Sequence, residues 1–451
     1  MKFSVREITL HERDVRLRMP FRFGIVTLTE APQAFVRARI VLSNGKESEG
    51  AAAELLAPKW FDKNPVLSNE ENFEQLRASL ALAKGAYTGG GANTAFGHFQ
   101  SHYRGQVDRA AGKRLNPLVA NYGPALVDRA LLDALCRGLG VSFYDAIRRN
   151  IAGLDLPAVF LESLRPAAQI AARHTVGLVD PITSTERRVN DGLPETLEEV
   201  LARYGHRWFK LKVGGDARAD VERLAAIASV LDRIAQPYHA SLDGNEQYAD
   251  VEGVLELWRR MKGERRLARL VSSIAFIEQP IKRQNALAAD VSALSREKPV
   301  IIDESDDSLD AFPHAKALGY MGVSSKTCKG IYKSLINAAR CRAWGPAYFM
   351  TGEDLTIQAG LALQQDLALV SLIGLAHVER NGHHYVNGMA SLPADEQDAF
   401  LRAHPDLYER SHGAVRLRIK DGSIAMRSLD CPGYASRALP DWTSMKEMKL
   451  Q

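Results

Sequence analysis

The sequence RWFKLKVGGDARADVERLAAIASVLDRIAQPYHASLD, residues 207–243, has an apolar run at each end and an amphipathic segment between them. In the middle segment, apolar residues such as Val221, Leu224 and Ala228 recur at helical spacing. Asp216 stands just before them, where a helix N-cap is expected. A strand, a helix and a second strand in this order predict a parallel β-sheet.

The same alternation continues on both sides of this stretch. Short apolar runs occur at 158–162, 207–213, 237–243, 274–278, 299–303, 321–326, 347–351 and 375–379. Repeated strand–helix units favour a closed (β/α)8-type barrel, with an open, doubly wound sheet as the alternative. We therefore expect a barrel domain, with the active site, over residues 155–390.

The rest of the chain has a different texture. Residues 36–42 alternate between apolar and polar side chains, as in a half-buried strand, and Asn44-Gly45 favours a tight hairpin turn. Helical spacing follows. We expect residues 1–154 to form an α+β capping domain and residues 391–451 to pack back on that domain.

Charged or amide residues end nearly every apolar run of the predicted barrel. They are Lys210 and Lys212, Asp243 and Asn245, Glu278 and Gln279, Asp303 and Glu304, Lys326, Glu353 and Asp354, and Glu379 and Arg380. In a (β/α)8 barrel the carboxyl ends of the strands share one rim, and that rim carries the active site. The pattern therefore predicts that these distant side chains converge on one mouth.

Three carboxylates indicate a metal site. Asp243, Glu278 and Asp303 end three consecutive predicted strands. Because adjacent strands are only about 5 Å apart, these carboxylates repel one another unless a cation lies between them. Hard oxygen ligands suit Mg²⁺, with Mn²⁺ as a substitute. The alternative is that each carboxylate is a helix N-cap or a solvated loop residue.

The lysines indicate acid–base chemistry. Lys210 and Lys212 are two positions apart on one predicted strand, so their side chains point to the same face. Their apolar neighbours indicate a buried strand, and we expect nearby positive charge to lower a lysine pKa, as a general base requires. The alternative is an edge strand with snorkelling lysines. Lys326 ends a run on the far side of the predicted barrel, and hence across its mouth.

These residues resemble the enolase superfamily, specifically its muconate-lactonizing branch, the mandelate racemase/muconate lactonizing enzyme family. The motifs that carry the resemblance are Lys210-Leu211-Lys212, Asp243-Gly244-Asn245, Ile277-Glu278-Gln279-Pro280, Ile302-Asp303-Glu304-Ser305, Lys326 and, early in the chain, Pro20-Phe21-Arg22-Phe23-Gly24. Three features depart from the family pattern. The chain is longer than typical members, mainly in the first domain and the tail. A single glycine, Gly330, follows Lys326 where the family usually has a Gly-Gly pair, and residues 351–354 match no specificity motif.

The resemblance implies a role for each matched position. The three carboxylates would hold Mg²⁺, which would bind the substrate carboxylate and absorb the charge of an enediolate. Lys212 and Lys326 would be the base or electrostatic partner on opposite faces of the substrate, and Lys210 would assist as a charged group. The other matched positions are Asn245 and Glu304, which would orient the metal ligands, and Phe21 and Phe23, in the loop that would cover the substrate.

Three further positions have open interpretations. Glu353 is either a substrate contact or proton carrier, or an N-cap for the helical segment that follows. His377 is either a satisfied core or rim histidine or a catalytic group. His383-His384 is either a surface turn or substrate contact, or part of a second metal site.

The predicted activity is abstraction of the proton α to a substrate carboxylate, leading to racemisation, epimerisation or cycloisomerisation. A dehydratase acting on a hydroxy or sugar acid shares the same enediolate chemistry. A non-catalytic, carboxylate-binding relative is a second alternative, although it has no need of both Lys212 and Lys326. A class I aldolase would use one buried lysine as a Schiff-base nucleophile, and the clustered carboxylates argue against it.

Composition limits the partners. A net charge of +4 spread along the chain gives no case for a nucleic-acid partner. The four cysteines are far apart, which argues against zinc ligation and a disulfide framework. With no signal peptide or membrane span evident, we expect a cytoplasmic homo-oligomer that binds a small-molecule carboxylate.

Overall fold

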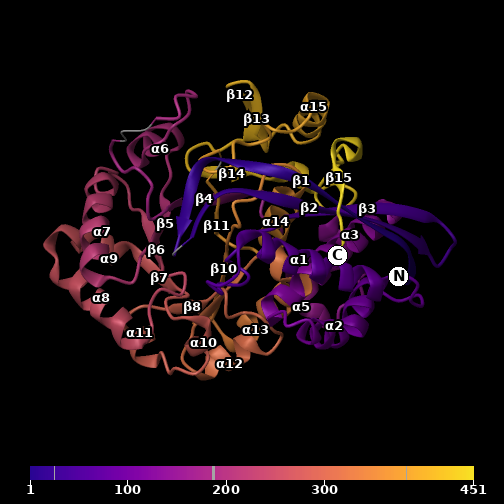
Figure 1. The fold of residues 1–451 in the computed structure, drawn as a ribbon, viewed down its shortest axis with the longest axis horizontal. Coiled ribbons are helices and arrows are strands. Elements are labelled where there is room, and N and C mark those ends of the chain that lie inside the picture. The colour runs from indigo at the N-terminus through magenta and orange to yellow at the C-terminus, as the bar shows by residue number, and fades with distance from the viewer. Residues whose placement is uncertain (25, 185–187, 382, 451) are drawn as a thin grey trace.

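The computed structural model describes residues 1–24, 26–184, 188–381 and 383–450. Eight parallel strands form a closed barrel, because the last of them pairs back with the first (Figure 1). The strands are β4 (Gln169–Val176), β5 (Trp208–Lys212), β6 (His239–Asp243), β7 (Ile274–Glu278), β8 (Val300–Ile302), β9 (Gly322–Ser325), β10 (Phe349–Gly352) and β11 (His377–Glu379). The predicted barrel is confirmed, and the open-sheet alternative is wrong.

Helices follow the barrel strands and surround them (Figure 1). They are α6 (Leu197–Tyr204), α7 (Ala217–Leu231), α8 (Val251–Gly263), α9 (Ala268–Ser273), α10 (Arg283–Ala286), α11 (Ser292–Glu297), α12 (Ala311–Ala317), α13 (Ile331–Trp344) and α14 (Leu361–Leu372), with short 3₁₀ turns η1 (Arg265–Leu267) and η2 (Thr327–Lys329). The predicted N-cap Asp216 accepts hydrogen bonds from the first backbone amides of α7. The apolar face predicted for this helix is buried against the barrel.

The first predicted strand, 158–162, is wrong. These residues form the short helix α5 (Ala158–Ser163), in which Val159 is 75% exposed while Phe160 is buried. In an apolar run of this length, the spacing of apolar residues alone does not distinguish a short helix from a short strand. The true first strand, β4, escapes a hydropathy pattern because buried polar groups such as Arg173 lie at its centre.

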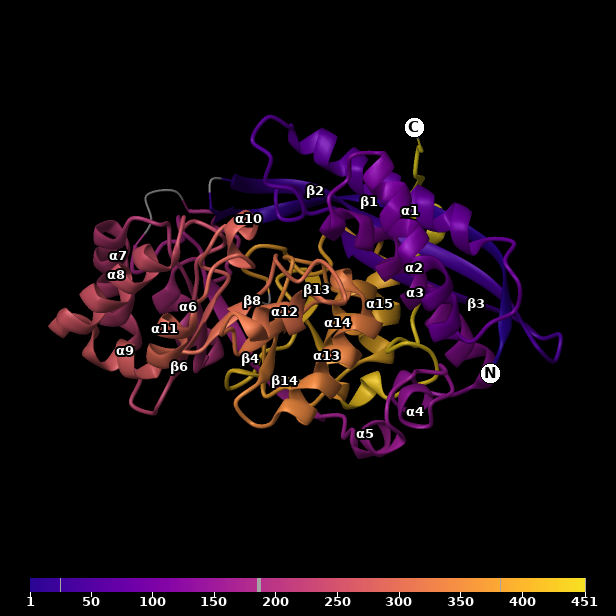
Figure 2. The same cartoon turned by 90° about the horizontal axis from the view of Figure 1, so that it is seen from below.

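The capping unit is a four-stranded antiparallel sheet with helices beside it (Figure 2). Its elements are β1 (Phe3–Phe23), β2 (Val26–Leu42), β3 (Glu47–Leu55), α1 (Asn69–Tyr87), α2 (Ala95–Gly112), α3 (Pro117–Leu139) and α4 (Phe143–Arg148), with β15 (Lys446–Glu447) at the sheet edge. The predicted turn at Asn44-Gly45 joins β2 to β3. At Gly50 the backbone of β3 approaches α3 so closely that a Cβ atom would lie 2.1 Å from Ala134 N.

The residues after the barrel contact both units. They form α15 (Ala394–Ala403), β12 (Tyr408–Ser411), β13 (Ala414–Leu417), β14 (Ser423–Ala425), the 3₁₀ turns η3 (Arg427–Leu429) and η4 (Trp442–Ser444), and β15. β14 pairs antiparallel with the barrel strand β4, and β15 pairs with β1 of the cap. The segment that we expected on the capping domain thus also pairs with a barrel strand. Across the described residues, no helix is long and apolar enough to cross a membrane.

Candidate active site

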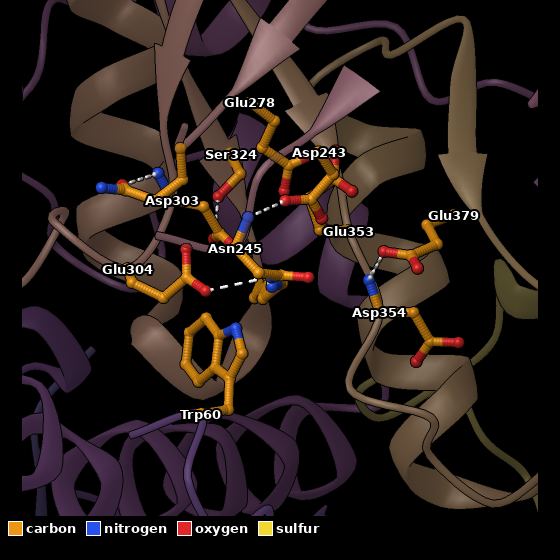
Figure 3. Close-up of polar contacts among 12 residues, drawn as sticks. Trp60, Asp243, Asn245, Glu278, Asp303, Glu304, Ser324, Glu353, Asp354 and Glu379 are labelled. Carbon is orange, nitrogen blue, oxygen red and sulfur yellow. Dashed lines mark hydrogen bonds and ion pairs between the residues drawn. The ribbon is translucent and has the colours of Figure 1, made fainter. Parts of the chain in front are cut away.

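The carboxyl ends of the barrel strands bring the predicted site residues together (Figure 3). Lys212, Asp243 and Glu278 are the last residues of β5, β6 and β7, and they stand side by side in the strand register. Asp303 directly follows β8. All three carboxylates are fully buried. Strand geometry therefore places them on one rim, as the sequence predicted.

Lys210 lies at the centre of the carboxylates. Its Nζ atom is 2.9 Å from Asp243, 2.8 Å from Glu278, 2.8 Å from Glu353 and 3.0 Å from Glu379. Burial alone would lower the pKa of Lys210, but the four carboxylates outweigh burial and raise the pKa well above its ordinary value. Lys210 is therefore a fixed positive charge.

Lys212 and Lys326 stand on opposite walls of the mouth, because β5 and β9 are four strands apart in the barrel. Lys212 Nζ donates to Asp243 Oδ2 at 2.6 Å and to Asn245 Oδ1 at 2.5 Å. Lys326 Nζ donates to Asp303 Oδ2 at 2.6 Å. Both lysines line the same cavity.

The expected lowering of a lysine pKa in the pair of Lys210 and Lys212 is wrong for Lys210. Burial alone would also lower the pKa of Lys326, but the adjacent Asp303 carboxylate reverses the effect and raises the pKa. Reciprocally, Lys326 and Lys329 hold the Asp303 pKa well below its ordinary value against the effect of burial. The sequence shows the lysines close together, but not how many carboxylates surround them.

The donor set fits a hard divalent cation. Burial, together with the negative charges of Asp243 and Glu353, raises the pKa of Glu278 well above its ordinary value. Glu278 Oε2 is buried and has no hydrogen-bond partner among the described residues. Within the described ranges, no three His, Cys, Asp or Glu side chains are already gathered as a metal site. Asp243 and Asp303 instead pair with lysines, and their hard oxygens are of the type that Mg²⁺ prefers.

Asn245 and Glu304 form a layer behind these groups. Asn245 donates from its backbone N–H to Asp243 Oδ1 at 2.8 Å and from Nδ2 to Glu304 Oε1 at 3.1 Å. Lys63, from the capping unit, reaches the same Glu304 oxygen at 3.2 Å. Gln279 Oε1 accepts the backbone N–H of Asp303 at 2.8 Å. These contacts orient the Asp243 carboxylate and hold the backbone at Asp303.

The capping unit closes the mouth. Phe21, Phe23 and Trp60 line a small cavity of about 30 Å³ together with the lysines. The Phe21 ring faces Lys212, whose Nζ is 5.7 Å from the ring centroid. The centroid of the Trp60 ring lies 4.1 Å from Lys326 Nζ. Phe23 also lines a second cavity of about 340 Å³ on its outer side. Phe21 and Phe23 thus lie where a substrate cover is expected.

Glu353 lies among the buried charged groups of the site, whereas His377 lies below the rim. Glu353 contacts Lys210 and the buried Arg173, and against the effect of burial these cations lower its pKa to about 2. It is a charged interior carboxylate and not a helix N-cap. His377 lies at the amino end of β11, stacked on Trp208 at 3.9 Å, and does not line the cavity. Its placement below the rim agrees with the core interpretation and not with a catalytic one.

Several site residues escape prediction from the sequence. Glu379 was visible as a strand end, but its contact with Lys210 depends on the closure of the barrel. Arg173 lies on the strand that the hydropathy pattern misses. Trp60 and Lys63 come from a loop of the capping unit and have no spacing that relates them to the barrel. His383 and His384 are buried, so the surface-turn interpretation is wrong.

Comparison with known proteins places this geometry in a family. Residues 192–436, more than half of the chain, match the family model described as Enolase C-terminal domain-like. The chain belongs to the enolase superfamily. The resemblance noted in the sequence is therefore confirmed, and with it the prediction of an enzyme of this superfamily. Among curated proteins, none matches the chain.

Solved structures of enolase-superfamily proteins share the whole architecture. Muconate lactonizing enzyme from Mucobacterium smegmatis, complexed with muconolactone, matches at 18% identity over 99% of this chain and 100% of that chain, with a TM-score of 0.62. The L-Ala-D/L-Glu epimerase from Bacillus subtilis matches at 16% identity over 96% and 99%, with a TM-score of 0.59. A superfamily member from Roseovarius nubinhibens ISM, complexed with magnesium, matches at 16% identity over 98% and 97%, with a TM-score of 0.58.

Proposed function

We propose that this enolase-superfamily enzyme removes the proton next to a substrate carboxylate and, with Mg²⁺, catalyses a racemisation, epimerisation or cycloisomerisation. The supporting observation is that Lys212 and Lys326 enter one cavity from opposite walls. A lysine on each wall can address each face of the α carbon. The likeness to an epimerase and to a lactonizing enzyme supports the same class of reaction.

Asp243, Glu278 and Asp303 would hold the Mg²⁺. When bound, the ion supplies positive charge beside the substrate carboxylate, which stabilises the enediolate left by the departing proton. The orphaned oxygen and raised pKa of Glu278 support a cation there. The likeness to a magnesium complex supports the choice of ion.

Each of the chain's own site residues then has a separate role. On one face of the substrate, one of the two lysines accepts the α proton at Nζ, and on the other face the second donates a proton from its Nζ. Lys210, fixed by four carboxylates, contributes positive charge without moving. Phe21 and Trp60 exclude water from the closed cavity, which strengthens the electrostatic contacts inside.

The proton step can be tested without knowing the product. We would incubate the enzyme and Mg²⁺ with a library of small carboxylates in deuterated water and measure deuterium at the α position by mass spectrometry. We expect exchange with at least one substrate. Elimination of water from the same substrate would identify a dehydratase instead.

Variants then assign the residues. Lys212→Ala and Lys326→Ala should each lower isomerisation by at least about 10²-fold while leaving exchange from one enantiomer only. Asp243→Asn, Glu278→Gln and Asp303→Asn should each abolish the Mg²⁺-dependent rate, whereas the exposed Lys113→Ala should not. Exchange that is unchanged by EDTA and by all three carboxylate substitutions would refute the metal role.

A further inference from the structure

A buried row of polar side chains connects the capping unit to the lysine on the far wall of the cavity. Glu54, near the end of β3, is 2% exposed, and its Oε2 atom lies 3.2 Å from Arg129 Nη2 and 3.2 Å from Thr327 Oγ1. Thr327 directly follows Lys326 and begins η2. Glu54 is therefore a cap residue that touches the backbone segment carrying Lys326.

The hydroxyl of Thr327 has more acceptors than hydrogens. Thr327 Oγ1 is 3.2 Å from Glu54 Oε2 and also 3.2 Å from Asp366 Oδ1. A hydroxyl has one hydrogen, so it can donate to only one of two ionised carboxylates. Asp366 is the acceptor of the Thr327 hydroxyl, because the same Oδ1 atom also receives the Thr327 backbone N–H at 3.0 Å, whereas Glu54 contacts Thr327 through the hydroxyl alone.

A proton on Glu54 resolves this conflict. The Glu54 O–H then donates to Thr327 Oγ1, and the Thr327 O–H donates to Asp366, so each oxygen has a partner. Arg380 Nη1 continues the row to Asp354 Oδ1 at 3.2 Å, and Asp354 lines the cavity. The row thus reaches the cavity through Asp366, which accepts from both Thr327 and Arg380, and through Arg380, which also donates to Asp354.

The surroundings of Glu54 agree with this assignment. The titratable and charged groups that face it are Arg129, Asp366, Asp354, Tyr122 and Cys328. Burial, which Arg129 only partly opposes, raises the pKa of Glu54 to about 7. A large fraction of the protein therefore carries the proton at neutral pH.

We propose that Glu54 is a positioning residue for Lys326, acting as a neutral carboxylic acid that holds Thr327 by donating a hydrogen bond to its hydroxyl. The importance of Lys326 for turnover rests on the proposed function; the hydrogen bond does not. When Glu54 loses its proton, two carboxylates face one hydroxyl hydrogen. The contact between Glu54 and Thr327 is then lost, Asp366 alone holds Thr327, and the adjacent Lys326 shifts.

Trp60 provides a readout that needs no substrate. Its ring centroid is 4.1 Å from Lys326 Nζ, so its fluorescence responds to displacement of that ammonium group. The Trp60 signal is obtained for each protein as the difference from the same protein carrying Trp60→Phe. In the wild-type protein we expect this signal to change between pH 6 and pH 8 with a midpoint near pH 7.

The variants separate the proposal from general effects of pH. Glu54→Gln retains a neutral donor, so it should keep the pH 6 signal at both pH values. Thr327→Val lacks the hydroxyl and should show no pH response, whereas Thr327→Ser should respond like the wild type. A response that persists in Glu54→Gln, or a wild-type signal that is constant from pH 6 to 8, would overturn the proposal.

A second measurement uses the unaltered chain. In protein labelled with ¹³C at the glutamate carboxyl carbon, the Glu54 resonance, assigned by its absence in Glu54→Asp, should titrate near pH 7; a midpoint near the ordinary 4.5 would refute a neutral Glu54. If a substrate is found, the wild-type kcat should fall about tenfold from pH 6 to pH 8 as the group ionises, with KM unchanged. In Glu54→Gln the fall should be absent, and an equal fall there would count against the proposal. If no carboxylate exchanges its α proton, the proposed function fails, while the fluorescence and carbon titrations still decide the state of Glu54.

Discussion

At the scale of single residues, the site is governed by the balance between buried charges. Lys210 is compensated by four carboxylates, and Lys212 and Lys326 by one each from the predicted metal set. A divalent cation and the two ammonium groups would therefore share the oxygens of Asp243 and Asp303. Whether positive or negative charge is in excess at the site therefore determines both the stability of the fold and the chemistry.

Loss of the Lys210 charge should destabilise the fold. Lys210→Met leaves the surrounding carboxylates buried without their common cation, and removing one partner of a buried ion pair costs about 3–5 kcal/mol. We expect the free energy of unfolding, measured by urea denaturation in EDTA, to fall by about that amount. Lys113→Met, at an exposed position, is the matched control and should change stability little. Equal stability of the two variants would show that Lys210 does not balance the carboxylates.

At the scale of secondary-structure elements, the contact between β3 and α3 depends on a missing side chain. Gly50→Ala would place a methyl group within 2.4 Å of Ala130 O and 2.1 Å of Ala134 N, so the strand and helix must separate. Overpacking of this kind typically costs about 1–3 kcal/mol. Gly85, in the exposed face of α1, has no atom within 4 Å of the same added methyl group.

These two glycines therefore give opposite predictions. Gly50→Ala should lower the melting temperature, whereas Gly85→Ala should raise stability by about 0.5–1 kcal/mol, because alanine favours the helix. Differential scanning calorimetry of the two variants checks both signs. A neutral Gly50→Ala would mean that β3 and α3 can move apart at no cost.

Phe23, the last residue of β1, borders two cavities. Phe23 lines both the inner cavity of about 30 Å³ and the outer one of about 340 Å³. Phe23→Ala should join them, so that longer carboxylates exchange their α proton faster relative to short ones and KM for short substrates rises. The comparison uses a series of increasing chain length. Val26→Ala, which changes only the outer cavity, should leave the relative rates unchanged.

The sequence predicts the barrel well because its elements repeat a local pattern. Strands such as β5 and β6 are buried runs that end in a charged residue, and the helix between them has a regular apolar face. The pattern fails at β4, where Arg173 is buried because Glu353 from another strand compensates its charge. It fails again at α5, whose apolar run is too short to show a period.

Some site residues can likewise be predicted from the sequence, and others cannot. Asp243, Glu278 and Asp303 are predictable because strand ends share a rim. The raised pKa of Lys210 is not predictable, since it requires Glu353 and Glu379 to reach across the closed barrel. Trp60 and Lys63 depend on how the capping unit lies over the mouth, which no local pattern encodes.

At the scale of the whole molecule, the interface between cap and barrel should make stability depend on pH. The pKa of Glu54 is about 7 in the folded state against an ordinary 4.5. Below pH 4.5 the group is neutral in both states. As the pH rises from 4.5 to 7, ionisation favours the unfolded chain, and above pH 7 the effect levels off at about 3 kcal/mol.

Comparison with Glu54→Gln isolates the effect of Glu54 ionisation on the free energy of unfolding. The unfolding free energies of wild type and variant should run in parallel below pH 4.5 and diverge up to pH 7, with the variant the more stable. Urea denaturation at intervals from pH 4 to pH 8.5 measures the difference. The exposed Glu162→Gln should show no such divergence. A constant difference across this range would place the Glu54 pKa at its ordinary value.

The pairing of β1 with β15 and of β4 with β14 has a consequence for synthesis on the ribosome. The first strand of the cap and the first strand of the barrel are both translated early, yet each pairs with a strand from residues 423–447. A nascent chain must therefore leave part of the backbone of both strands unpaired until translation is nearly finished. Unpaired strand edges recruit other chains, so this protein should depend on chaperones most strongly while it is still being translated.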